Sequence, residues 1–167
     1  MPKLELLRPD HADAVLTFER QNRAYFATTI SDRGDEYFEE FTERHSTSLA
    51  DQEAGEGAYY VLVDDGGELL GRFNLYVVED GVANLGYRVA ERAAGQGVAT
   101  AAVGELCRLA ASRHGLRTLR AATSEANVAS QRVLVKNGFL PVGPADPSEI
   151  GGKRGSWFER RLPHDPT

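Results

Sequence analysis

The chain has 167 residues, 41% hydrophobic and 26% charged, which excludes a disordered polypeptide and suits one folded domain over residues 1–167. A net charge of −6 argues against a general nucleic-acid binder, whose surface carries a basic excess. One cysteine, Cys107, excludes an internal disulfide, and no apolar run approaches the ~18 residues of a membrane span, so we expect a cytoplasmic protein that makes no membrane contact.

The first half of the sequence predicts one strand, two helices and a hairpin. Asp10 can cap the first helix, and Gly34 breaks the chain before the second. Two β-rich runs flank the turn Asp64-Asp65-Gly66-Gly67, which is typical of a hairpin. The expected elements are a strand over 3–9, a helix over 11–22, an acidic helix over 35–53 and hairpin strands within 58–81.

The second half alternates strands and helices. Its expected elements are a strand over 82–90, a helix ending near 114, a strand over 116–123, a helix over 127–137, and strands starting at 139 and 157. Gly138 stands where a left-handed residue ends a helix. The complete order predicts an α+β (mixed α/β) fold with a mixed sheet of about seven strands and about four helices.

Two glycines lie between the strand over 82–90 and the alanine-rich helix that follows. Such a turn presents unpaired helix N–H groups, which bind anions, and glycine lets a phosphate approach the backbone closely. The candidate phosphate-binding residues are Gly95, Gln96, Gly97, Val98, Ala99 and Thr100. The alternative is that these glycines only make a tight turn.

Two common nucleotide-binding patterns fail here. A Walker-type loop needs lysine and serine or threonine after its last glycine, whereas Val98 follows Gly97. A dinucleotide fingerprint needs a small residue at position 100 and an acid about 20 residues later, but the sequence has Thr100 and then "GLRTLRA" over 115–121.

The pattern that remains is Arg-x-x-Gly-x-Gly, filled by Arg92, Gly95 and Gly97. Together with "SEANVASQRVLVKNGFLPVG", it resembles the GNAT superfamily of N-acetyltransferases, and the second block resembles the branch of ribosomal-protein N-terminal (alanine or serine) acetyltransferases. The resemblance covers nearly the whole chain and is most specific over 85–143. It implies a splayed sheet that binds acetyl-CoA.

The resemblance also implies which residues hold acetyl-CoA. The strand residues Tyr87, Arg88 and Val89 would pair with the amide groups of the pantetheine arm. The loop from Arg92 to Thr100 would hold the pyrophosphate, and Asn127 would reach the arm as well as cap its own helix.

Ser130 and Glu149 are the catalytic candidates by the same resemblance. Ser130 would protonate the leaving thiolate, although a helix serine can also bond back to a carbonyl. Glu149 would accept the amine proton, with a solvated loop carboxylate or a water chain as alternatives. Many relatives carry a glutamate where this chain has Asn84, and asparagine cannot take a proton.

The N-terminal helices are expected to bind the acceptor. Glu19, Asn22 and Tyr25 place a carboxylate near aromatic rings, which suits a cationic amine, although ordinary core and surface roles fit them too. We expect Trp157 and Cys107 in the core, and the histidines 11, 45, 114 and 164 on the surface with no metal-ligand spacing.

The sequence thus favours an acetyl-CoA-dependent transferase that acetylates a primary amine, on a protein N-terminus or a small molecule. The alternatives are a non-catalytic acyl-CoA sensor and a nucleotide-binding or structural α/β domain. No metal and no nucleic acid are expected, and a homodimer is left open.

Overall fold

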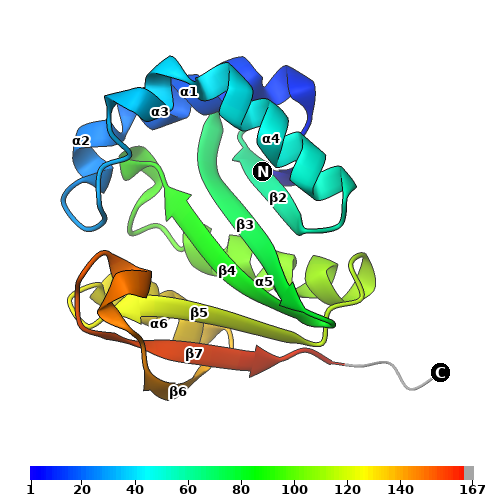
Figure 1. The fold of residues 1–167 in the computed structure, drawn as a ribbon, viewed down its shortest axis with the longest axis vertical. Helices are drawn as coiled ribbons and strands as arrows, with labels where there is room; N and C mark the ends of the chain where they lie inside the picture. The colour runs from blue at the N-terminus through cyan, green and yellow to red at the C-terminus, as the bar shows by residue number, and fades with distance from the viewer. Residues whose placement is uncertain (164–167) are drawn as a thin grey trace.

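The computed structural model describes residues 1–163, in which seven strands form one mixed sheet in the order β1-β2-β3-β4-β5-β7-β6 (Figure 1). All neighbouring strands are antiparallel except β4 and β5, which run parallel. The strands are β1 (Lys3–Leu6), β2 (Gly57–Val63), β3 (Leu69–Glu79), β4 (Val82–Val89), β5 (Thr118–Ser124), β6 (Leu140–Pro144) and β7 (Gly155–Arg161).

Helices cover the two faces of this sheet unequally. In Figure 1, α5 lies behind the sheet, whereas α1, α3 and α4 lie along the β2–β3 side and leave β5 and β7 uncovered in front. The helices are α1 (Ala12–Gln21), α2 (Arg23–Phe26), α3 (Asp35–Glu39), α4 (Phe41–Glu53), α5 (Val98–Ser112) and α6 (Val128–Lys136). Three short 3-10 turns span Pro9–His11, Glu91–Ala93 and Pro147–Ile150. The predicted α+β fold, with seven strands and four main helices, is confirmed.

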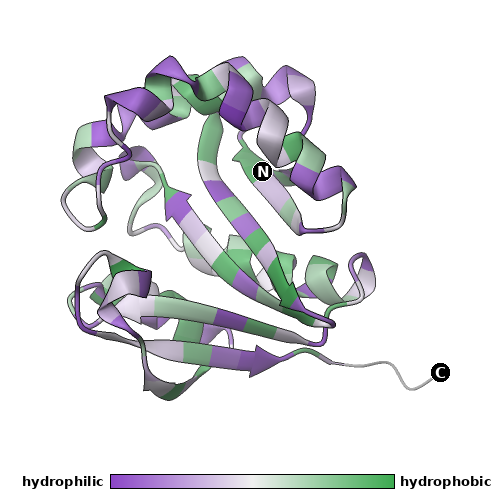
Figure 2. Cartoon of the chain, in the orientation of Figure 1, coloured by the Kyte–Doolittle hydropathy of each residue, from purple (hydrophilic) through white to green (hydrophobic). Residues whose placement is uncertain are grey.

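Strand alternation explains why the sheet has a core on each face. Phe73 and Leu75 of β3 are fully buried and pack in the cluster that includes Leu106 of α5. Arg72 and Asn74 point to the opposite face, and β3 accordingly shows alternating hydrophobic and hydrophilic bands in Figure 2. A second apolar cluster fills the space under α1, α3 and α4. The front of the sheet therefore carries polar side chains wherever helices do not cover it.

The acidic helix predicted over 35–53 is interrupted. Glu40 leaves the helical conformation, with φ −100° and ψ 16°, so α3 ends at Glu39 and α4 starts at Phe41. Tyr37 and Phe41, one on each side of the break, are both buried and meet edge to face. Tertiary packing of these rings thus overrides the continuous helical pattern of the sequence.

The parallel pair at the centre of the sheet separates soon after it forms. Register pairs join Val82, Ala83 and Asn84 of β4 to residues 118–120 of β5, and no further pair follows among the described residues. Because β4 continues to Val89 and β5 to Ser124, their later residues diverge and leave a V-shaped opening (Figure 1).

Candidate active site

The opening between β4 and β5 exposes backbone groups inside the sheet. From Leu85 to Val89, β4 pairs with β3 on one side only, because its pairing with β5 stops at Asn84. Unpaired strand N–H and C=O groups are a template for another extended amide chain. This edge can therefore bind a peptide-like ligand through the backbone alone.

The glycine loop forms one end of the same opening. Gly95 and Gly97 have φ values of +73° and +75°, a conformation that L side chains rarely adopt. The hydrogen bonds of α5 begin with Ala101 N donating to Gly97 O at 3.0 Å, so the preceding N–H groups have no partner within the helix. These groups, with the helix dipole, make an anion site at the start of α5.

A cavity of about 410 Å³ joins the strand edge and the glycine loop. Its lining combines apolar side chains with the backbone of the glycine loop, which suits an extended, partly anionic ligand. The predicted cofactor residues that line it are Tyr87, Arg88, Val89, Gly95, Gly97, Val98, Ala99, Thr100 and Asn127.

Two predicted cofactor residues do not line this cavity. The guanidinium of Arg92 is held by Asp64 at 3.2 Å and by Glu68 at 3.3 Å, in the β2–β3 turn. The Gln96 side chain donates to Arg92 O at 3.0 Å and is exposed. Both residues shape the outside of the loop.

Two basic residues of α6 also line the cavity, and the sequence analysis predicted neither of them. Arg132 and Lys136 stand four residues apart, on the helix that Asn127 starts, and so share one side of it. Their four-residue spacing, shortly after Asn127 and Ser130, could have indicated from the sequence that both face the cavity. Their charges lie where they can attract the same anion as the glycine loop.

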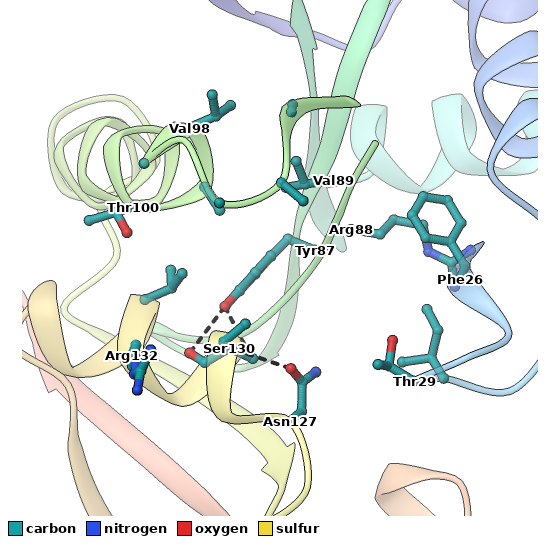
Figure 3. A pocket seen from close by; sticks show the side chains of 18 of the residues that line it. Phe26, Thr29, Tyr87, Arg88, Val89, Val98, Thr100, Asn127, Ser130 and Arg132 are labelled. Carbon is teal, nitrogen blue, oxygen red and sulfur yellow. Dashed lines mark hydrogen bonds between the residues drawn. The ribbon is translucent and has the colours of Figure 1, made fainter. Parts of the chain in front are cut away.

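Ser130 lies at the centre of a small hydrogen-bond network (Figure 3). Its Oγ lies 2.9 Å from the Tyr87 hydroxyl, and its backbone N donates to Asn127 Oδ1 at 3.2 Å. Tyr87 reaches across the opening from β4, with its ring stacked on Phe73 at 5.6 Å. Burial raises the pKa of Tyr87, so its phenol stays protonated and able to donate. The tyrosine hydroxyl was not expected beside this serine.

A second cavity, of about 310 Å³, adjoins the first on the front of the sheet. Tyr87, Asn127 and Ser130 line both cavities, and Glu149 lines the second. Glu149 Oε2 accepts from the Trp157 indole N–H at 2.9 Å, which fixes the carboxylate in its loop. Ser130 therefore lies between a space suited to an extended ligand and a separate space that holds a carboxylate.

The loop carrying Glu149 is tied to the N-terminal helices. Lys153 Nζ donates to Thr29 O at 2.6 Å, and both residues line the second cavity. The roof of this cavity thus comes from two segments far apart in the sequence.

The predicted acceptor residues separate in the structure. Tyr25 lines the first cavity. Asn22 is buried, donating to Phe18 O and accepting from Glu91 N, so it connects α1 to the turn after β4. Glu19 is 1% exposed and lies within ion-pair distance of three arginines, where its charge is already neutralised.

Four side chains differ from the expected exposure. His11 and His45 are buried rather than on the surface, because each bonds to the segment after β1: His11 Nδ1 accepts from Arg8 N at 2.9 Å, and His45 Nε2 lies 3.1 Å from Arg8 O. Trp157 is only half-buried, with the Arg120 guanidinium 4.6 Å from its ring centroid. His114 is half-buried, and His164 lies outside the described residues.

Cys107 is buried in the core as expected, and burial raises the pKa of its thiol, which leaves it protonated and unreactive. Within residues 1–163, no helix is both long and apolar enough to cross a bilayer. The same range contains no group of three or more His, Cys, Asp and Glu side chains placed to hold a metal ion.

Comparison with protein families gives a match over residues 3–140 to the acetyltransferase (GNAT) domain. The chain belongs to the GNAT acetyltransferase family. Solved structures of similar fold hold CoA or acetyl-CoA. Family membership replaces the alternative of a nucleotide-binding or purely structural domain.

Solved structures of similar fold include several ribosomal-protein acetyltransferases. A ribosomal-protein-S5-alanine acetyltransferase from Vibrio fischeri aligns with a TM-score of 0.87 at 19% identity, over 96% of this chain and 93% of that one. The Salmonella typhimurium acetyltransferase that modifies the N-terminal serine of L7/L12 gives 0.83 at 20%, over 97% and 95%. Mycobacterium smegmatis RimJ, in complex with CoA-disulfide, gives 0.83 at 21%, over 95% and 80%. No curated protein sequence matches the chain.

Proposed function

We propose that this GNAT domain is an acetyl-CoA-dependent N-acetyltransferase that acts on a primary amine of a protein or peptide N-terminus. The observation that carries the proposal is the position of Ser130, between the cavity with the backbone anion site and the cavity that holds Glu149. In acyl transfer from a thioester to an amine, the space for the thioester must meet the space for the amine, and a proton donor must lie where they meet. The names of the similar structures support a protein N-terminus as the acceptor.

The residues present fit acetyl-CoA. The unpaired edge of β4 suits the two amide groups of the pantetheine arm, and the N–H groups at the start of α5 suit the pyrophosphate. Arg132 and Lys136 add positive charge beside it. Bound in this way, acetyl-CoA would supply an activated acyl group.

The mechanism we infer is direct attack without a covalent enzyme intermediate. The amine nitrogen forms a bond to the thioester carbonyl carbon, and the carbon–sulfur bond breaks. Ser130 Oγ gives its proton to the departing sulfur and is reprotonated from the Tyr87 hydroxyl 2.9 Å away. Burial raises the pKa of Tyr87, so the phenol is protonated before the step, and its phenolate takes a proton back from water once CoA has left.

The amine must lose a proton during the same reaction. Glu149 is the carboxylate that lines the acceptor cavity, and we infer that it accepts this proton directly or through one water. Asn84, at the position where many relatives carry a glutamate, has a buried Oδ1 without a hydrogen-bond partner in the described residues, and an amide oxygen cannot serve as the base.

Calorimetric titration with acetyl-CoA, with ATP and NAD as controls, tests the cofactor half of the proposal. We expect saturable binding of acetyl-CoA and none of the controls. A mass-spectrometric assay with alanine- and serine-initiated peptides then tests the transfer, with a gain of one acetyl group at the N-terminus as the expected product. Binding without acetylation of any peptide or amine would indicate a non-catalytic acyl-CoA sensor instead.

A further inference from the structure

A third cavity, of about 280 Å³, lies between α3 and α4 and the front of β2 and β3. Arginine and tyrosine side chains dominate its lining: Arg33, Arg44, Arg72, Tyr37, Tyr59 and Tyr76. Both residue types donate hydrogen bonds, and arginine in particular matches a carboxylate with two parallel donors.

The charges around this cavity do not cancel. The single carboxylate of Glu19 faces three guanidinium groups, at 2.8 Å from Arg33, 3.0 Å from Arg88 and 3.7 Å from Arg72. Burial lowers the pKa of Arg88; Glu19 acts against this shift, and Arg33 and Arg72 add to it.

The other charged groups at the cavity leave this excess in place. Arg44 adds a positive charge and is balanced by Glu40 at 3.5 Å. Asp51 and Glu56 contribute negative charge near Tyr59. The positive excess therefore lies in the lining itself, where Arg33, Arg44 and Arg72 stand against the single carboxylate of Asp51.

The arginines have donors left for a ligand. Arg72 Nη1 donates to the Tyr37 hydroxyl at 3.1 Å, and Arg33 donates to Glu19 through Nε while its guanidinium lies 4.6 Å from the Tyr37 ring centroid. A guanidinium has five N–H donors, so most of those on Arg33 and Arg72 are not used by these contacts. The Tyr37 hydroxyl and ring thus orient Arg72 and Arg33, respectively.

This cavity is next to the one that contains Ser130 and Glu149. Asn74 lines the third cavity and is the register partner of Gly86, which lines the second. The Tyr76 ring, which lines the third cavity, lies beside Gly86, because a Cβ there would be in ordinary van der Waals contact with the ring at 3.6 Å. One extended molecule can therefore occupy both cavities along the front of the sheet.

We propose that the acceptor is an acidic peptide, whose amine lies near Ser130 while a carboxylate further along the chain binds Arg33 and Arg72. This inference rests on the proposed function and names its substrate class. It is opposite in sign to the cationic acceptor expected from Glu19 in the sequence, because Glu19 is neutralised by the arginines and does not line the cavities.

Two heptapeptides with alanine at the N-terminus, identical except that three glutamates are replaced by glutamines, test this proposal. We expect kcat/KM to be about tenfold higher for the glutamate peptide, mainly through KM, and the difference to shrink in 0.5 M salt, about 3–4 times physiological ionic strength. Equal values for the two peptides, or a preference for spermidine over both, would overturn it.

Variants of the arginines locate the effect. Arg33→Gln and Arg44→Gln should each reduce the preference for the glutamate peptide several-fold, and Arg44 is exposed enough for its replacement to leave the fold intact. Arg20→Gln is the matched control, because Arg20 is an exposed arginine of α1 outside the cavity. A preference unchanged in both cavity variants contradicts the proposal.

Binding without turnover separates this inference from the function itself. The same two peptides, already N-acetylated, can be titrated into the protein with CoA present. Tighter binding of the glutamate peptide that depends on Arg33 supports the anion site even where no peptide is acetylated. Equal binding, together with equal acetylation of the two free peptides, rejects the anion site and leaves the transferase intact.

Discussion

In the function proposed above, the two sides of the opening in the sheet would recognise their ligands by different means. On the cofactor side, the contacts come from backbone groups of β4 and from the start of α5, with glycines at 95 and 97. On the acceptor side, they would come from charged side chains brought together from α4, β3 and the segment before α3. Backbone recognition leaves a signature in a few consecutive residues, whereas a charge cluster leaves none until the chain is folded.

Removing the charge of Glu19 should break the acceptor side most severely. Glu19→Gln leaves three arginines close together without their carboxylate, and breaking a buried ion pair typically costs about 3 kcal/mol in the free energy of unfolding. Chemical denaturation measures this loss. Glu36→Gln, an exposed acid on α3, should change stability by less than about 0.5 kcal/mol. Equal stability of the two variants would mean that the cluster is not a coupled network.

Ser130 stands where the two sides meet, and its replacement should affect turnover without affecting either binding step. For Ser130→Ala we expect kcat to fall about a hundredfold, as for loss of a general acid, with the acetyl-CoA Kd nearly unchanged. Ser112→Ala is the matched control, because Ser112 only bonds back to Arg108 O on α5. A normal kcat in Ser130→Ala would mean that Ser130, like Ser112, has only a structural role.

The cofactor side can be tested with two glycines at opposite ends of α5. Gly97 and Gly115 have φ values of +75° and +64°, and a Cβ added at either position would meet no other atom within 4 Å. Replacing either with alanine should therefore cost a similar ~1 kcal/mol of stability through backbone strain. Only Gly97→Ala should weaken acetyl-CoA binding, by about tenfold, because a methyl group there keeps the ligand from the backbone. Calorimetry that finds both variants binding equally well would exclude the loop as the phosphate site.

His114 lies away from both sides and gives the smallest effect. Burial and Arg113 lower its pKa below the ordinary 6.5, and its Nε2 lies 2.7 Å from the Tyr60 hydroxyl. Between the lowered pKa of His114 in the folded chain and the ordinary 6.5 of the unfolded chain, the unfolded chain binds a proton that the folded chain does not. Stability therefore falls as the pH decreases through this range. His114→Gln should flatten the decrease in Tm between pH 7 and pH 5 by about 1–2 °C. An unchanged dependence of Tm on pH would show that other groups cause the decrease in Tm.

Features that depend on neighbouring residues could be predicted from the sequence, whereas contacts between distant residues could not. The fold, the hairpin at residues 64–67 and the glycine loop follow from periodicity and turn chemistry, which are local properties. The role of Glu19 could not be predicted, because its partners Arg33, Arg72 and Arg88 lie 14, 53 and 69 residues away. The Tyr87 hydroxyl was missed for a related reason: its contact with Ser130 exists only because β4 and β5 diverge.

That divergence also bears on the solubility of the protein. Unpaired strand edges usually recruit strands of other molecules, which leads to aggregation. Here the free edge of β4 lines a cavity whose walls include the start of α5 and α6, so another sheet that approaches this edge meets these helices. A slender chain still has access through the narrow opening. The fold thereby leaves the unpaired edge of β4 accessible to an extended ligand, while the surrounding helices limit its pairing with strands of other proteins.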